Sequence, residues 1–381
     1  MTAVALPFQV FLLTGSTLAV GAIAGVQLVG VLLFALGGGA VADTVDRRRL
    51  LFATQVGLAL TSLLLAGLAV LDRPPLWAIY GVAFAAAAIG AVDQPARSSA
   101  LPRLVPRERF PAALALNQVN FQTSSVAGPA FGGLLLATVG PGGAYLVDVA
   151  TYGAAILAVA LMAPLPPLGG VTRASLEAVR EGLRFAASRR IILSTFVADL
   201  DAMIFGMPTS LFPVLSQQVF RSGPIGFGLM EAAPAAGALV AALSSGWVGS
   251  VRRPGRATIV AIVIWGVAIA AFGLSTFSLA LALVFLAVAG AADMLSAVFR
   301  STIVQLEAPD ELRGRVSALH TLVVTSGPRL GDMEAAAVAA VIGPTASVVS
   351  GGVLCVLGVI GVARAFPELA AHVSRTVPGP R

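Results

Sequence analysis

Ionisable side chains occur inside several long apolar runs of this sequence, where a charge has few partners. Asp293 lies in the run 278–305, and Asp199 and Asp201 lie in the run 191–216. An ionisable residue within a membrane-spanning segment costs about 2.5–3.5 kcal/mol, so each one needs a partner, water or a function. A carboxylate in such surroundings can bind and release a proton as its access to water changes. The candidates for proton coupling are Asp148, Asp199, Asp201 and Asp293.

These carboxylates can also have structural roles. Asp199 and Asp201 are two residues apart and point about 200° from each other on a helix, so at most one of them faces a cavity. A structural ion pair with Arg300 or Arg329 is the alternative for Asp293 and for whichever of Asp199 and Asp201 faces the cavity.

A separate pair lies further along the chain. Arg329 and Asp332 are three residues apart, a spacing that places both on one face of a helix. It predicts an intramembrane ion pair that supports packing.

The residues needed for other chemistry are scarce. The chain has one cysteine and two histidines, which lie far apart, so we expect neither a disulfide framework nor a metal site. All 24 basic residues are arginine, so the lysine of a phosphate-binding loop is missing and ATP-driven transport is excluded. The net charge of +6 is spread in short runs between apolar stretches, unlike the basic face of a nucleic-acid-binding protein. We expect no cofactor, no nucleic acid and no enzymatic activity.

Composition places the chain in a membrane. Of 381 residues, 57% are hydrophobic and 11% charged, against about 25% charged in an average soluble domain. Twelve apolar runs follow one another, eleven of them long enough for a full span of about 20 residues. The first, 2–13, reaches only about 20 Å at 1.5 Å per residue. We therefore expect an all-α multi-pass protein whose first helix is truncated, and a mis-assigned start is the leading explanation.

Arginine sets the expected orientation, because it accumulates in short cytoplasmic loops. If the loop 43–49 is cytoplasmic, only Arg73 and Arg221 fall outside and Arg329 falls within a span. The other 21 arginines lie in alternate loops and in the tail. This asymmetry predicts that both termini are cytoplasmic, and the expected location is the cytoplasmic (inner) membrane of a bacterium.

The two halves of the chain repeat each other. The segment 97–108 aligns with 300–311 at a constant offset of 203, and the Gly-Pro-x-x-Gly motif at 128–132 recurs at 327–331. Two six-helix halves related by duplication are an architecture of secondary transporters. The expected organisation is a first six-helix half at 1–163, a cytoplasmic linker with an amphipathic helix at 164–190, a second six-helix half at 191–366 and a cytoplasmic tail at 367–381.

Two motifs suggest how such a protein would move. In the first, Gly39-x-x-x-Asp43-x-x-Asp46 precedes three arginines, which suits a charged lock at the helix ends. In the second, a helix breaker stands among glycines at 128–133, which predicts a kink against a close neighbour. A purely topological loop and a kink without coupling are the alternatives. The candidates for conformational gating are Gly39, Asp43, Asp46, Arg47, Arg48, Arg97, Gly128, Pro129 and Gly132.

These motifs resemble those of the major facilitator superfamily. The loop 43–49 resembles its loop motif, with Thr44 where the family usually has a basic residue, and Gly128–Gly133 resembles a signature of its antiport exporters. With further matches at 95–108, 226–234, 253–255, 314–316 and 327–332, the chain resembles the branch that contains the enterobactin exporter and the macrolide efflux proteins. The resemblance implies the major facilitator fold, with the first, fourth, seventh and tenth helices lining a central cavity.

The expected function is export of a small amphipathic molecule, a drug-like compound or a siderophore, by proton antiport and alternating access. An importer on the same fold and a membrane protein without transport activity are the alternatives. The expected partners are the small-molecule substrate, protons and the lipid bilayer, and the protein is expected to be a monomer. The candidates for contact with substrate are Phe84, Asn117, Asn120, Phe196, Phe205 and Phe299.

Overall fold

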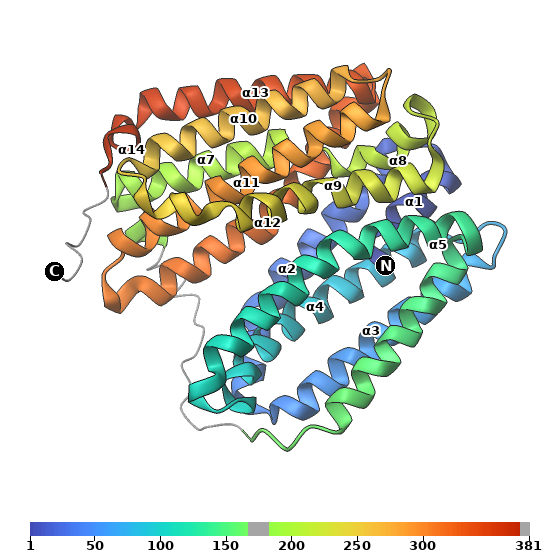
Figure 1. Cartoon of the computed structure of the whole chain (residues 1–381). Helices are drawn as coiled ribbons and strands as arrows, with labels where there is room; N and C mark the ends of the chain where they lie inside the picture. The colour runs from blue at the N-terminus through green and yellow to red at the C-terminus, as the bar shows by residue number, and fades with distance from the viewer. Residues whose placement is uncertain (167–182, 374–381) are drawn as a thin grey trace. The chain divides into compact units, whose positions relative to one another are not determined.

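The computed structural model describes residues 1–166 and 183–373, except for the side chains of 35–44, 310–311, 313–315 and 317–318. Helices make up nearly all of this part of the chain, and no strand occurs in it (Figure 1). The chain forms two compact units. Unit 1 is Met1–Leu176 with Ser222–Leu229, and unit 2 is Glu177–Arg221 with Met230–Arg381.

Unit 1 contains five α-helices and one short 3₁₀ turn within its described residues. They are α1 (Thr2–Thr14), α2 (Thr17–Thr44), α3 (Arg47–Ala69), α4 (Leu76–Leu104), the 3₁₀ turn η1 (Arg107–Arg109) and α5 (Phe110–Ala160). The last of these contains two of the predicted spans, because the backbone leaves helical geometry at Gly140. The predicted amphipathic helix of the linker falls largely on 167–182, outside the described residues.

Unit 2 contains most of the remaining helices. They are α7 (Arg190–Gly206), the 3₁₀ turn η2 (Thr209–Leu211), α8 (Phe212–Val214), the π-helical turn η3 (Leu215–Val219), the 3₁₀ turn η4 (Ser245–Ser250), α10 (Pro254–Leu274), α11 (Leu279–Glu307), α12 (Asp310–Ile342), α13 (Pro344–Ala365) and α14 (Pro367–Ala371). Between them in sequence, α9 (Gly223–Leu243) begins in unit 1 and ends in unit 2.

The same local signal ends corresponding helices in the two units. Gly140 has φ 70° and is followed by Pro141, and Gly343 has φ 88° and is followed by Pro344. A positive φ favours glycine, and proline suits the first turn of the next helix. These two positions are also 203 residues apart, so the repeat extends to the tight turns between helices.

Helix packing repeats as well. In unit 1, α3 packs against α4 and α5, and in unit 2, α10 packs against α11 and α13. The contact between α10 and α13 depends on small residues. A Cβ at Gly266 would lie 2.8 Å from the carbonyl oxygen of Gly352, so only glycine lets the backbones approach this closely.

Nine helical segments of the described residues are long and apolar enough to cross a membrane, judged by length and composition. Helix α1, with 13 residues, is shorter than these. The segment that begins with α7 is interrupted after Gly206, where Met207 and Pro208 leave helical geometry before the turn η2. Interrupted helices place backbone and polar groups inside a membrane only where protein or a cavity surrounds them.

Candidate functional site

In unit 2, one buried arginine lies close to two carboxylates, one from α7 and one from its own helix α11. The Arg300 guanidinium, on α11, pairs through Nη2 with Asp199 Oδ1 of α7 at 2.7 Å. The same nitrogen lies 3.9 Å from Asp293 Oδ1, two turns earlier on α11. Side-chain exposure is 1% for Arg300, 0% for Asp199 and 35% for Asp293. The inner pair is therefore sealed from its surroundings, whereas Asp293 is accessible.

One hydroxyl completes the arrangement. Arg300 Nη1 donates a hydrogen bond of 2.7 Å to Ser296 Oγ, one turn earlier on the same helix. We refer to Asp199, Asp293, Ser296 and Arg300 as the buried charge cluster. Beyond the ion pairs, both carboxylate oxygens of Asp199, Oδ1 of Asp293 and Nε of Arg300 have no hydrogen-bond partner among the described residues. A native structure satisfies most buried polar atoms, so unsatisfied atoms gathered in one place call for an explanation.

The charges of the cluster do not balance. Two carboxylates face one guanidinium, so the cluster carries one negative charge in excess when both aspartates are ionised. Burying an unpaired charge costs several kcal/mol, and a proton on either carboxylate removes that cost. This arrangement can therefore hold a proton, with Asp293 as the group that is accessible from outside the cluster.

Asp201 points away from this cluster, as its spacing from Asp199 requires. Its Oδ1 packs against the backbone of Gly358 on α13, where a Cβ would collide with it. Its Oδ2 is buried and has no hydrogen-bond partner among the described residues. Of the two neighbouring aspartates, the structure brings only Asp199 to the arginine.

The corresponding arginine of unit 1 has a local partner. Arg97 Nη2 lies 3.1 Å from Asp93 Oδ2, four residues earlier on α4. Asp93 is buried, and its Oδ1 accepts hydrogen bonds from Thr54 Oγ1 at 2.6 Å and Gln55 Nε2 at 2.9 Å, both on α3. This carboxylate is fully satisfied by three donors and ties α4 to α3.

The loop motif lies beside this network. Asp46 caps α3, because its Oδ1 accepts a hydrogen bond of 3.2 Å from the backbone N–H of Arg49. Arg47 is buried and donates from Nε to Ser99 Oγ of α4 at 2.9 Å, and Arg48 donates to the carbonyl of Ala160. The arginines thus join the start of α3 to α4 and to the end of α5. Gly39 and Asp43 lie in the stretch 35–44, outside the part of the molecule whose side chains are described.

Asp148, the remaining proton-coupling candidate, has hydroxyl partners. Its Oδ2 accepts from Thr2 Oγ1 at 2.5 Å and from Ser62 Oγ at 2.9 Å. One turn away, the buried Tyr145 hydroxyl donates to Gln9 Oε1 at 2.7 Å. The two interactions connect α1, α3 and the second part of α5 through polar atoms in the interior of unit 1. In this cluster two hydroxyls bind Oδ2, and the N-terminal ammonium of Met1 lies 3.6 Å from Oδ1.

The two Gly-Pro motifs make equivalent helix contacts. In unit 1, a Cβ at Gly132 would lie 3.3 Å from the Val4 side chain of α1, whereas a Cβ at Gly128 would meet nothing within 4 Å. In unit 2, a Cβ at Gly331 would collide with the backbone carbonyl of Met203 on α7. The last glycine of each motif therefore packs against the first helix of its own repeat.

The predicted pair of Arg329 and Asp332 interacts electrostatically along α12, and its role in packing stays a prediction. Asp332 Oδ1 also accepts hydrogen bonds from Thr209 Oγ1 and from the Ser210 backbone N–H, each at 2.6 Å, and Arg329 donates to the carbonyl of Thr325. Asp332 therefore also joins α12 to the interruption after α7.

The substrate candidates fall into two groups. Phe196 and Phe299 are buried in the interior of unit 2, where Phe299 packs against Trp247 with ring centroids 6.3 Å apart. Their contact with substrate stays a prediction. Phe84 and Phe205 are partly exposed, and the amides of Asn117 and Asn120 on α5 are exposed.

His320 belongs to none of the sequence motifs, yet it interacts with the buried charge cluster. It lies on α12 with its ring centroid 6.1 Å from that of Phe196, and it interacts electrostatically with Asp199 and Arg300. The available signal was a lone histidine in an apolar run, in the same half as Asp199 and Arg300.

Comparison with known proteins identifies the family. Residues 1–380 match the model of the Transmembrane secretion effector family of the major facilitator superfamily. The chain belongs to this family. The prediction of an all-α major facilitator fold with two six-helix halves is thereby confirmed, whereas the residue boundaries of the predicted parts remain a prediction.

Relatives of this protein include enterobactin exporters. The Enterobactin exporter EntS of Citrobacter koseri is 29% identical over 360 residues, which cover 94% of this chain and 86% of that protein. EntS of Shigella boydii serotype 18 is 29% identical over 366 residues with the same coverage. The similarity supports a multi-pass membrane transporter that moves a small molecule, and not an enzyme.

Solved structures agree on the fold. A POT family transporter in complex with 5-aminolevulinic acid superposes with a TM-score of 0.77 and 10% identity, covering 97% of this chain and 93% of that one. A bacterial homologue of the human lysosomal transporter Spinster, in an inward-facing and unoccupied conformation, gives a TM-score of 0.72 and 16% identity, covering 96% and 95%.

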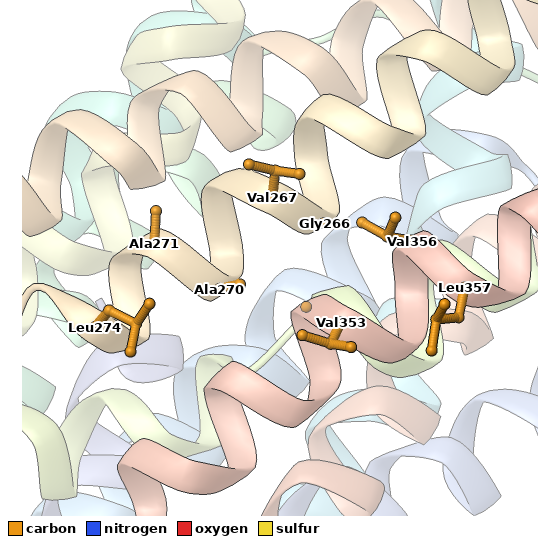
Figure 2. A pocket seen from close by; sticks show the side chains of 9 residues that line it. Gly266, Val267, Ala270, Ala271, Leu274, Val353, Val356 and Leu357 are labelled. Carbon is orange, nitrogen blue, oxygen red and sulfur yellow. The ribbon is translucent and has the colours of Figure 1, made fainter.

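The protein also has an apolar groove, which is lined by none of the residues of the buried charge cluster. It has a volume of about 340 Å³ and runs between α10 and α13. Figure 2 shows side chains of both helices along it, among them Val267 and Leu274 of α10 and Val353 and Leu357 of α13. Its lining offers almost no polar atoms, so it contributes no chemistry to the site.

Proposed function

We propose that this protein exports a small amphipathic molecule, of the siderophore or drug-like class, by exchanging it for protons through alternating access. The observation that carries the coupling is the buried charge cluster, in which two carboxylates share one guanidinium. The support for export is the similarity to the enterobactin exporters.

Proton exchange follows from the different accessibility of the two carboxylates. Asp293, with 35% of its side chain exposed, is the group that takes up a proton. Once Asp293 is neutral, Arg300 pairs only with Asp199, and the charges within the cluster balance. When Asp293 loses its proton, the excess charge returns and favours a rearrangement of α11 against α7.

The loop motif and the Gly-Pro motif are the proposed sites of the conformational change. Arg47 and Arg48 tie the start of α3 to α4 and α5, so their release would accompany opening at that end. Pro129 removes a backbone hydrogen bond in α5 one turn before Gly132, the glycine that packs against α1, and so favours a bend at this position. Gly39 and Asp43 complete the lock in this proposal.

Substrate contact is proposed for the exposed amides of Asn117 and Asn120 and for the partly exposed rings of Phe84 and Phe205. Amides can hydrogen-bond polar groups of an amphipathic ligand while the rings cover its apolar part. We also propose that the protein acts as a monomer in the cytoplasmic membrane of a bacterium, with both termini in the cytoplasm. A reporter fused to the C-terminus that is active only in the cytoplasm tests this orientation.

The experiment uses cells that lack their own exporters and express this chain. Release of enterobactin and depletion of a fluorescent amphipathic dye are measured with and without a protonophore. We expect efflux that the protonophore abolishes. Asp293→Asn is expected to lose gradient-driven efflux and to retain energy-independent exchange of substrate. Asp72→Asn, a change at an exposed aspartate between α3 and α4, is the matched control and is expected to behave like the wild type.

Three results would contradict the proposal. Efflux that continues unchanged with the protonophore would exclude proton coupling. Full gradient-driven efflux by Asp293→Asn would remove this residue from the mechanism. Accumulation of the label instead of its depletion would indicate an importer on the same fold.

A further inference from the structure

We propose that His320 is a second proton-binding group of the buried charge cluster and that its protonation transfers Arg300 from Asp199 to Asp293. The inference rests on the proposed proton coupling and adds the device that would convert a bound proton into a change of helix contacts. Its basis is the position of one imidazole relative to a charge pair that joins two helices.

The first observation is an unsatisfied nitrogen. His320 Nε2 is buried and has no hydrogen-bond partner among the described residues. The ring lies beside Phe196, with centroids 6.1 Å apart and planes inclined by 34°. A histidine that only fills the core is normally satisfied at both ring nitrogens. An open nitrogen next to a charge pair is instead a place where a proton can bind.

The second observation is the set of charges that faces this ring. Helix α12 packs against α7, α11, α13 and the turn η2. The ring interacts electrostatically with Asp199 of α7 and with Arg300 of α11, and Arg300 in turn lies 3.9 Å from Asp293. Asp201 of α7 points to Gly358 instead. Helix α13 has no ionisable carboxylate or base between Pro344 and Val362, and η2 has none. Asp199 is thus the group for which an imidazolium would compete.

The third observation is that Arg300 has a second carboxylate within reach. Its Nη2 is 2.7 Å from Asp199 and 3.9 Å from Asp293, so a movement of about one ångström reverses the preference. With neutral His320, the cluster carries one excess negative charge. With a proton on Nε2 the net charge is zero, and imidazolium then shares Asp199 while Arg300 turns to Asp293.

This exchange has a mechanical consequence. The Asp199–Arg300 pair joins α7 to α11, whereas an Asp293–Arg300 pair lies within α11 and joins nothing. Protonation of His320 would therefore replace the contact between α7 and α11 by a contact between α7 and α12. The proton enters at Nε2 and leaves from the same atom when the exchange reverses. His320 is in this view a positioning residue for the coupling carboxylates.

The test uses the fact that the chain has only two histidines. His372→Gln leaves His320 as the single histidine, so selective ¹⁵N labelling of the full chain in detergent or nanodiscs gives one imidazole to follow by NMR. We expect this signal to titrate between about pH 5 and 8. We expect its midpoint to move in His372→Gln/Asp199→Asn, because the interacting carboxylate is gone.

Transport supplies the second readout. His320→Gln keeps a hydrogen-bonding side chain without a proton-binding nitrogen, and size-exclusion and thermal melting show whether it folds. We expect it to retain energy-independent exchange. We expect its difference in efflux rate between pH 6 and pH 8 to be at least about tenfold smaller than that of the wild type. His372→Gln is the matched control, and its pH profile should equal that of the wild type.

The two readouts separate this inference from the proposed function. If the wild type shows no gradient-driven efflux of either probe, the proposed antiport fails and the NMR titration alone judges His320. A signal that does not titrate, or a midpoint that ignores Asp199→Asn, overturns the inference. So does a folded His320→Gln protein with the pH profile of the wild type, even where antiport itself is demonstrated.

Discussion

Two equivalent arginines of the repeat, Arg97 and Arg300, lie in opposite surroundings. Arg97 is 60% exposed and pairs with Asp93 on its own helix. Arg300 is 1% exposed, and the position that corresponds to Asp93 is Ser296, so its carboxylates come from α7 and from two turns earlier on α11. The repeat therefore keeps the arginine and the bond to the residue four positions earlier, but moves the charge partner to another helix.

This difference separates stability from coupling. In unit 1 the carboxylate is satisfied by three donors, so it holds α3 and α4 together without an excess charge. In unit 2 two carboxylates face one guanidinium. The pair Asp199–Arg300 joins α7 to α11 at a buried position. The second copy has Ser296 where the first has Asp93, so Arg300 has no carboxylate four residues earlier and pairs across helices instead.

The largest effect is expected from Asp199→Asn, because it leaves the buried Arg300 without its closest partner. Breaking one side of a buried ion pair costs about 3–5 kcal/mol, whereas Arg97 is exposed enough that its pair contributes far less. Thermal unfolding in detergent measures the loss. The double variant Asp199→Asn/Arg300→Gln should recover part of the stability, since the buried guanidinium is gone and the remaining carboxylate, Asp293, is 35% exposed. Equal melting of Asp199→Asn and the wild type would show that the pair is not buried as described.

A smaller effect is expected from the glycines that end the two Gly-Pro motifs. Gly331→Ala forces a Cβ against the backbone of Met203 and should cost about 1–3 kcal/mol, because backbone cannot yield as a side chain can. Gly132→Ala meets only the Val4 side chain and should cost less. Gly128→Ala, with nothing within 4 Å, is the control. A reversed order in thermal melting would show that the two repeats do not pack their first helices as described.

The next prediction transfers the arrangement of unit 1 into unit 2. Ser296→Asp gives Arg300 a carboxylate four residues earlier, as Arg97 has. We expect gradient-driven efflux to fall about tenfold, which corresponds to about 1.4 kcal/mol, because the arginine then has a permanent partner on its own helix. Ser296→Ala removes the hydroxyl without adding charge and is the control. If Ser296→Asp transports at the rate of the wild type, exchange of the Arg300 partner is not part of the mechanism.

The smallest effect is expected from Arg97→Gln. An exposed ion pair between residues four apart on a helix contributes about 0.3–0.5 kcal/mol, and Asp93 keeps its bonds to Thr54 and Gln55. Thermal melting should change by little more than the error of the measurement. A loss as large as that of Arg300→Gln would remove the contrast between the two arginines.

The sequence by itself determined the fold class and the repeat. The length of the apolar runs dictates how many helices can cross a bilayer, and a constant offset of 203 residues requires no knowledge of contacts. Gly128–Gly133 was likewise predicted as a kink against a close neighbour, because proline breaks a helix and glycine lets another backbone approach. These are local properties, written in composition and spacing.

Only the tertiary structure decided which charges meet. Asp199 and Asp201 are indistinguishable by sequence, yet the rotation of α7 directs one to Arg300 and the other to Gly358. Asp332 bonds to Thr209 at the interrupted end of α7 besides interacting with Arg329, and His320 interacts with the cluster from a helix that spacing does not relate to it. The physical reason is that partner choice depends on the rotation and register of packed helices, which the contacts of many small residues set together.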